Sequence, residues 1–479
     1  MEREKKKKRQ SARIIATNMF MGLSVVVIVT VLTLIAMGYN FNKEWELEQS
    51  GLVQVNSNPS GAIVEIDEES QFSRTEMSKM LSAGEHTIKI SKTGYDVWTR
   101  VLNVESGLLT RVDWARLFPV ERTVEKVHEY ETLRLVIASP DNQYLILLPE
   151  DSAIAQTINI KNDEIKYDKI DFSAVMGLEK NEVPTGTLEV IEWNKNSDKF
   201  LMKWTTEEKV NWLFIDIKQP ANNVNLSSKF LLGFDNLMIA SDAGDKIWAM
   251  EGGNLRMLNI TELTISGVLI ADIESATNNA TTVAYVREDE KDGRVVGIYK
   301  DGEKGGTTVQ KINPTIESVK VALGSYWGDD WIAYNMDNRI FVRSGTYPSY
   351  GKTASTLKTI AEHDIDFTPE FAVTSPSGRF AVAASGNQMV VVDAELKDYW
   401  TYQVETELVG VNWLDNFMTW EIWEEKLVVR DFDGNNRREI TDASGSMQLV
   451  SLTENNRWLY YIGSVAEEGG QYVLNRQRL

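Results

Sequence analysis

Apolar residues form one long run near the start of the chain and many short runs after it. No charged side chain occurs between Arg13 and Lys43, and residues 20–39 are almost wholly apolar. As a helix, twenty residues span about 30 Å, which matches the hydrocarbon core of a membrane. The pattern therefore predicts a transmembrane helix within residues 14–40.

The charges on either side of this run predict its orientation. Residues 1–13 carry seven Lys or Arg and two Glu, a net charge of +5, whereas the rest of the chain carries −25. Because basic flanks stay in the cytoplasm, we expect residues 1–13 to be a basic cytoplasmic tail and the C-terminal bulk to be extracytoplasmic. A cleaved signal peptide is the alternative, although its apolar core is usually shorter. A buried core helix would leave the basic flank unexplained.

Residues 51–118 alternate between apolar and polar side chains in short runs. The segments GLVQVNS and AIVEID have period two, as half-buried strands do, and the turn NPSG separates them. The later segment AGEHTIKISKTGYDVW contains a further strand between turns at Gly84 and Gly94. We expect a β-domain of five strands, with Tyr95 and Trp98 in its core or at an interface.

This small domain resembles the PEGA domain family. Pro59, Gly61 and Ala62 match three of the four signature letters, with Ser60 in place of Glu. The positions that match the second signature are Gly84, His86, Gly94 and Tyr95. The resemblance implies a small β-sandwich of surface and envelope proteins, with a role in adhesion, spacing or ligand contact. Residues 68–81 depart from the family pattern, and we expect a longer or more helical connection there.

From about residue 120 onward, a turn followed by an apolar strand recurs eight times. The eight motifs are about 45 residues apart on average, which is a spacing typical of β-propellers. Each unit reads as four antiparallel strands, as a propeller blade does. A β-sandwich would also alternate, but would not readily repeat one motif in order. The motifs start at Ser139, Asn194, Ser241, Ser275, Ser325, Ser375, Leu414 and Thr453.

The fold class predicted for the chain is all-β with one N-terminal transmembrane helix, and residues 121–479 are the propeller. Seven blades remain an alternative if the weak motif at Ser275 or Leu414 is a false count. The last unit lacks a fourth strand, which residues 121–130 are placed to supply; pairing the two ends would close the ring. Its turns resemble those of TolB-like and WD-repeat-like propellers, although the recurring Trp-Asp dipeptide is absent.

The sequence singles out no catalytic, cofactor-binding or metal-binding residue. The chain has no Cys, and its three His residues, at positions 86, 128 and 363, are far apart. His86 is expected to make structural hydrogen bonds. Residues 431–439 resemble half of a calcium loop, but Gly434 and Glu439 have the wrong spacing, so a turn is favoured, as it is for residues 327–330. We therefore expect no cofactor.

Tryptophan is abundant, with 14 residues. We expect most of those in the blades to fill the wedge between adjacent sheets, where a large side chain buries much area, although one near a channel mouth could stack on a sugar or a partner. The residues concerned are Trp193, Trp248, Trp327, Trp331, Trp413, Trp420, Trp423 and Trp458.

These patterns predict a single-pass, membrane-anchored extracytoplasmic protein that presents its propeller to a protein or an envelope polymer. Its acidic body repels phosphate backbones, so no nucleic-acid partner is expected. The alternative is an extracytoplasmic hydrolase that uses carboxylates in the propeller channel, which 70 acidic residues leave open. A signalling sensor would need a cytoplasmic output that a 13-residue tail hardly provides.

Overall fold

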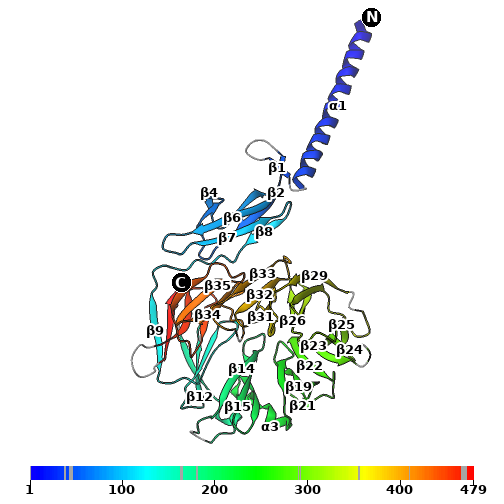
Figure 1. Ribbon diagram of the computed structural model, residues 1–479. Helices are drawn as coiled ribbons and strands as arrows, with labels where there is room; N and C mark the ends of the chain where they lie inside the picture. Colours follow the sequence, from blue (N-terminus) through cyan, green and yellow to red (C-terminus); the bar gives the residue numbers. More distant parts are fainter. Residues whose placement is uncertain are drawn as a thin grey trace. The chain divides into compact units, whose positions relative to one another are not determined.

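The structure is a computed structural model, and it divides into two units, residues 1–121 and 122–479 (Figure 1). The first unit holds the N-terminal helix and a small β-sandwich, and the second is a ring of β-sheets. The residues described are 2–36, 39–41, 47–161, 165–179, 182–289, 291, 293–353, 356–408, 410–464 and 472–479.

Helix α1, Glu2–Ala36, contains the apolar run. Its segment Thr17–Leu34 has a mean hydropathy of 2.0 and no buried part, so it is long and apolar enough to cross a membrane. The predicted span of residues 14–40 extends too far, because strand β1, Tyr39–Phe41, begins soon after the helix.

The small domain is a β-sandwich, as predicted, but it has seven described strands, β2 to β8, in place of the five expected. One sheet pairs β2 with β1, β5 and β8, and the other has the order β4-β3-β6-β7. Alternate residues of both sheets face the core, where Val53, Ile88 and Trp98 are fully buried. The strands are β2 Leu47–Val55, β3 Ile63–Ile66, β4 Glu69–Arg74, β5 Met77–Ser82, β6 Gly84–Ser91, β7 Trp98–Val104 and β8 Leu109–Val112.

The expectation of a longer or more helical connection over residues 68–81 is wrong. This segment forms β4 and β5, which belong to different sheets and therefore link the two layers. A tight turn at Asp67 and Glu68, both at positive φ, starts it. The Asp67 carboxylate stabilises that turn, because Oδ1 accepts the Thr87 backbone N–H at 2.8 Å and Oδ2 lies 2.6 Å from Nδ1 of His86. His86 thus has the structural role that was predicted.

The second unit is a propeller in which the described strands form eight sheets, so the eight-blade prediction is confirmed. From blade 1 to blade 6, the first strands of successive blades contact one another (Figure 1). The first four blades are β10 Leu135–Ala138, β11 Tyr144–Leu148, β12 Ile154–Asn159 and β13 Lys166–Asp171; β14 Thr187–Trp193, β15 Lys199–Thr205, β16 Val210–Asp216 and β17 Val224–Asn225; β18 Asn236–Ile239, β19 Lys246–Glu251, β20 Asn254–Asn259 and β21 Thr264–Ile265; β22 Ile273–Asn279, β23 Thr282–Asp289, β24 Gly293–Lys300 and β25 Thr307–Lys311.

The motif at Ser275 is a complete blade, whereas the motif at Leu414 belongs to a sheet with three described strands. Three short helices, α2 Ser173–Met176, η1 Pro220–Asn222 and α3 Leu226–Phe230, lie in connections. The last four blades are β26 Val321–Tyr326, β27 Asp329–Met336, β28 Arg339–Gly345 and β29 Leu357–Asp364; β30 Phe371–Thr374, β31 Phe380–Ser385, β32 Gln388–Asp393 and β33 Tyr399–Gln403; β34 Met418–Trp423, β35 Lys426–Asp431 and β36 Arg438–Asp442; β37 Val450–Leu452, β38 Trp458–Ser464, β39 Tyr472–Arg478 and β9 Val124–Tyr130.

Ring closure occurs as the sequence predicted. Strand β9, from the start of the unit, pairs antiparallel with β39 at its end and completes blade 8. The guanidinium of Arg476 on β39 donates to Glu125 on β9 at 2.8 Å. Tyr130 of β9 packs in a buried cluster with Leu145 of blade 1 and Tyr460 of blade 8. Backbone pairing and apolar packing therefore both hold the two ends together.

Large side chains fill the wedges between blades. Trp248 of blade 3 and Trp331 of blade 5 are buried, and each donates its indole N–H to the backbone of the next blade, at Ala280 (2.9 Å) and Gly378 (2.6 Å) respectively. For these two residues the predicted wedge role is confirmed. Apolar burial of this kind stabilises the contact, while the N–H bond fixes the spacing of adjacent sheets.

We predict that Tyr130→Ala lowers the free energy of unfolding of the propeller by about 3 kcal/mol, because it empties a buried site at the closure. Val124→Ala is the matched control, since Val124 is an exposed residue of the same strand, and should change stability by less than about 0.5 kcal/mol. Urea unfolding of the detergent-solubilised chain, followed by tryptophan fluorescence, measures both. Equal effects of the two substitutions would contradict a stabilising closure.

Candidate functional site

Blade 7 lacks a regular innermost strand among its described residues. Where other blades begin with a paired strand, this blade has an isolated bridge between Trp413 and Thr419. The Trp420 N–H also bonds to the Asn412 carbonyl at 2.9 Å. Residues 412 and 413 therefore lie beside β34, but they pair with it over too short a stretch to form a strand. The wall of the central channel is therefore interrupted at this blade.

A pocket of about 480 Å³ lies beside this interruption, and we call it the turn-face pocket. The turn face is the end of the propeller where turns join the first and second strands of each blade. Turns of blades 1, 6, 7 and 8 contribute to the pocket, so it exists only when these blades are assembled. Its volume is in the range of small-ligand sites. The lining includes Pro140, Asp141, Asn142, Pro376, Asn412, Trp413, Asp415, Trp420, Thr453 and Glu454.

The lining is acidic and aromatic. It holds three carboxylates, from Asp141, Asp415 and Glu454, and none of its residues is Lys, Arg or His. The rings of Trp413 and Trp420 add flat apolar surface to these acceptors. Aromatic rings beside carboxylates attract cations, and the same groups also suit the hydroxyls and apolar faces of sugars. Anionic ligands are disfavoured by charge repulsion.

Local hydrogen bonds fix two of the carboxylates. Oδ1 of Asp141 accepts the Ser139 hydroxyl at 2.6 Å and the Gln143 N–H at 3.1 Å. Oδ1 of Asp415 accepts backbone N–H groups of the next turn at 2.8 and 2.9 Å. Both are Asx-type turns, which hold the side chain in one position. The acidic character of the pocket is thus built into turns that the fold requires.

Contacts with neighbouring blades hold the apolar and amide groups of the pocket. The Trp413 ring lies parallel to Phe380 of blade 6, with centroids 6.2 Å apart and 10° between planes. Its indole N–H is shielded from solvent and has no hydrogen-bond acceptor within the described residues. On the other side, the Ser451 hydroxyl donates to Oδ1 of Asn142 at 2.9 Å and links blade 8 to blade 1.

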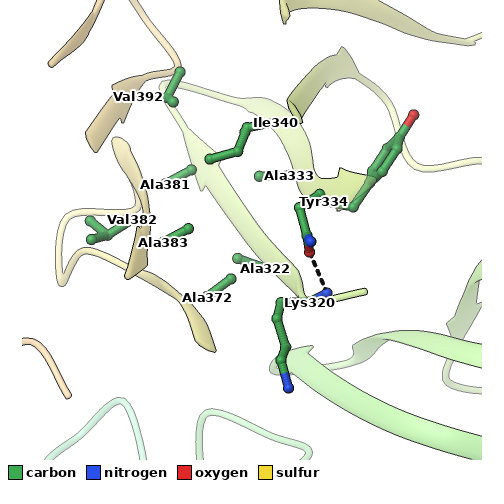
Figure 2. A pocket seen from close by; sticks show the side chains of 11 residues that line it. Lys320, Ala322, Ala333, Tyr334, Ile340, Ala372, Ala381, Val382, Ala383 and Val392 are labelled. Atoms are coloured by element: carbon green, nitrogen blue, oxygen red, sulfur yellow. Dashed lines mark hydrogen bonds between the residues drawn. The ribbon is translucent and has the colours of Figure 1, made fainter. Parts of the chain in front are cut away.

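Two other cavities do not add to this site. Figure 2 shows an apolar gap between blades 5 and 6, lined by small side chains such as Ala322, Ala333 and Ala381, and its volume of about 10 Å³ is enough for one water at most. A third pocket, of about 520 Å³, lies between blades 1 and 2 beside Lys166, Lys169 and Lys218. Lys218 is engaged there by Asp198 at 3.2 Å.

Glu192 is on β14, and its carboxylate is buried between β14, β18 and β22, the first strands of blades 2, 3 and 4. Its Oε2 accepts the Ile239 N–H at 2.6 Å, and Oε1 lies 3.4 Å from Nδ2 of Asn278. Burial raises the pKa of Glu192 to about 7, although both hydrogen bonds oppose the shift. The polar partners described for Glu192 are the side-chain amide of Asn278 and the backbone N–H of Ile239, so its carboxylate joins blades 2, 3 and 4.

Glu405 and Glu421 form a second carboxylate group, around Arg430 of blade 7. The buried guanidinium of Arg430 bonds to both carboxylates, and Arg437 also bonds to Glu405. Burial raises the pKa of Glu421. Burial opposes ionisation of Glu405 as well, but hydrogen bonds from Glu421 and the arginines lower its pKa to about 2. The arginines account for this pair structurally, and it does not line the turn-face pocket.

The structure does not bring the three His residues together. His86 lies in the sandwich, His128 is on β9, and His363 on β29 stacks against Tyr399 with ring centroids 3.7 Å apart. Burial lowers the pKa of His363. No group of three or more Asp, Glu or His side chains in the described part of the chain is arranged to hold a metal ion.

Two turn predictions are confirmed. The Gly434 N–H bonds to the Asp431 carbonyl at 2.9 Å, which makes residues 431–434 the turn between β35 and β36. Trp327 and Gly328 form the turn between β26 and β27, both at positive φ, and the Trp327 side chain is 81% exposed. The turn-face pocket was not predicted; the weak motif at Leu414 was its one signal in the sequence.

Comparisons with known proteins agree with the small domain and leave the propeller's role open. Residues 50–115 match the PEGA domain family. No curated protein matches the chain. Among solved structures, it is similar to the Cps50 (Swd1) β-propeller domain of Myceliophteria thermophila, with 9% identity, a TM-score of 0.40, and coverage of 74% of this chain and 99% of that one.

Two other solved structures are similar to a comparable degree. Apo AztD from Citrobacter koseri has 11% identity and a TM-score of 0.39, with coverage of 81% of this chain and 96% of that one. An oligogalacturonate lyase in complex with manganese has 10% identity and a TM-score of 0.40, with coverage of 74% and 98%. None of these likenesses bears on the function of this chain.

We predict that Glu192 makes the stability of the propeller fall with rising pH. The unfolded carboxyl ionises near pH 4.5 and the folded one near pH 7, so its cost to folding is absent below pH 4.5 and complete above pH 7. In Glu192→Gln, the free energy of unfolding relative to the unmodified chain should therefore rise by up to about 3 kcal/mol between pH 4.5 and pH 8. Urea unfolding at the two pH values measures this difference.

Glu189→Gln, at an exposed position of the same strand, is the matched control for loss of one acidic residue. The comparison across pH removes any constant cost of replacing the carboxylate by an amide. A Glu192→Gln difference that stays constant from pH 4.5 to pH 8 would show that burial does not shift this group.

Proposed function

We propose that this protein is a single-pass membrane protein whose propeller binds a protein or an envelope polymer on the outer side of the membrane. The apolar segment Thr17–Leu34 supports the anchor, and the basic residues before it support a cytoplasmic N-terminus. The PEGA domain at residues 50–115 agrees with an extracytoplasmic role.

The turn-face pocket is the observation that carries the binding role. Four blades build it, two of its carboxylates are fixed by their own turns, and aromatic rings provide apolar contact area. A site with rigid acceptors and flat rings binds without paying much ordering entropy. Its acidity favours a basic protein segment or a hydroxyl-rich polymer over an acidic one.

Binding is favoured over carboxylate-dependent hydrolysis. A glycosidase of the usual type needs a pair of carboxyl groups, one on each side of the bond that it cleaves. Glu405 and Glu421 are close enough to interact, but Arg430 and Arg437 occupy their oxygens. Glu192 has a raised pKa, yet its described partners are Ile239 and Asn278.

We predict that external protease digests the bulk of the chain in intact cells from which any outer barrier has been removed. A tag placed before Met1 should survive in a membrane-protected fragment of a few kilodaltons, because the basic tail lies inside. A tag after Leu479 should be lost. Immunoblotting of both tags measures the topology, and loss of the N-terminal tag with survival of the C-terminal one would reverse the orientation.

We predict that a photo-crosslinking residue at position 454, in the turn-face pocket, forms an adduct with the partner in intact cells. Position 207 is the matched control, because Glu207 is also an exposed Glu but lies in the hairpin between β15 and β16, at the opposite end of the blades. Gel-shift analysis of the full-length chain should show an adduct from position 454 and none from position 207. Adducts from position 207 alone would place the binding surface elsewhere.

A further inference from the structure

The small domain carries an exposed apolar row on one of its sheets. Leu52 of β2, Met80 of β5 and Leu109 of β8 are 38%, 41% and 43% exposed. Leu52 is the registered partner of both Met80 and Leu109, so the three side chains lie side by side across three strands. Residues of the same strands that point to the opposite side, such as Val53 and Val112, face the core and are fully buried.

The rows on either side of this apolar row have no carboxylate. Gln54, Ser78 and Arg111 are registered with one another on one side. Ser50 and Ser82 are registered on the other side. By the alternation of the strands, the nearest acidic residues on this face are Glu48 at one end and Glu76 and Asp113 at the other. Among the registered residues of the apolar row and the two rows beside it, Arg111 carries the one charge.

The outer face of the other sheet has a different character. There Glu65 and Lys89, which are registered partners, form an ion pair at 3.0 Å. Glu85 and Thr87 lie further along the same face of β6 and are exposed. Val101, 57% exposed on β7, is an isolated apolar residue opposite Thr87. Phe72 of β4 is fully exposed as well, so the sheet of β2, β5 and β8 differs in having its three exposed apolar side chains in register.

The same sheet is covalently close to the membrane segment. Helix α1 ends at Ala36, and β1 begins at Tyr39 and pairs directly with β2 at Gln49. Three Cα steps span at most about 11 Å, and the strand pair and three residues of β2 add about 15 Å. Leu52 thus lies within about 26 Å of the last helical residue along this path.

We propose that the face centred on Leu52, Met80 and Leu109 rests on the outer leaflet of the membrane that holds α1. This inference rests on the membrane anchorage proposed above and adds a second lipid contact to it. The three side chains enter the interfacial region, as the apolar faces of peripheral proteins do, and Arg111 reaches lipid phosphates. The face would then hold the small domain flat on the membrane.

Spin labels test this directly, because the chain has no Cys and each variant carries a single label. The full-length chain is placed in nanodiscs of phosphatidylcholine and phosphatidylglycerol, and three variants are compared. Met80→Cys reports on the proposed face, Val101→Cys reports on an exposed apolar residue of the other sheet, and Val27→Cys reports on the helix. Power saturation with oxygen and with a water-soluble nickel complex measures lipid and water exposure.

We expect the ratio of oxygen to nickel accessibility to be several-fold higher at position 80 than at position 101, and highest at position 27. A water-exposed label at position 80, with a lipid-exposed one at position 27, would overturn this inference and leave the membrane anchor intact. A position-80 label protected from both reagents would overturn it by showing that protein covers the face. A water-exposed label at position 27 would overturn the anchor and the inference together.

Discussion

The pairing of β9 with β39 is the constraint on which the propeller depends. The blades are separate sheets, so side-chain packing, hydrogen bonds between blades and chain connections hold one blade against the next. By completing blade 8 with a strand from the other end of the unit, the chain converts an open row of sheets into a ring. The turn-face pocket follows from this closure, because blades 8 and 1 provide part of its lining.

A ring that is closed in this way can tolerate a local irregularity. Blade 7 has three described strands and a bridge where an innermost strand would run, yet Trp413 still stacks on Phe380 of blade 6. Arg430 of the same blade bonds to Glu421 on β34 and to Glu405 in the segment after β33. The turn-face pocket lies beside this irregular segment, and its carboxylate acceptors belong to turn residues.

The two units meet different physical demands. In the propeller, polar residues at the turn face are held by hydrogen bonds within and between blades, as Asn142 and Ser451 show. In the small domain, one sheet carries an exposed ion pair and the other a registered row of exposed apolar side chains, although both cover the same core. An exposed apolar face is costly in water, so its position next in sequence to a membrane-length helix is consistent with a lipid surface as its neighbour.

The helix, the strands and the repeat can be predicted from the sequence, because their signals are local. Twenty uncharged apolar residues, strands of period two, and a turn repeated about every 45 residues each depend on neighbours in the chain. Even the closing strand followed from counting strands per unit. The tertiary structure alone decided where the chain departs from its own repeat. The segment of residues 68–81 forms two strands because each finds a partner in a different sheet. The turn-face pocket joins Asp141 to Asp415 and Glu454, residues from three blades, and no local pattern records which turns the closed ring brings together.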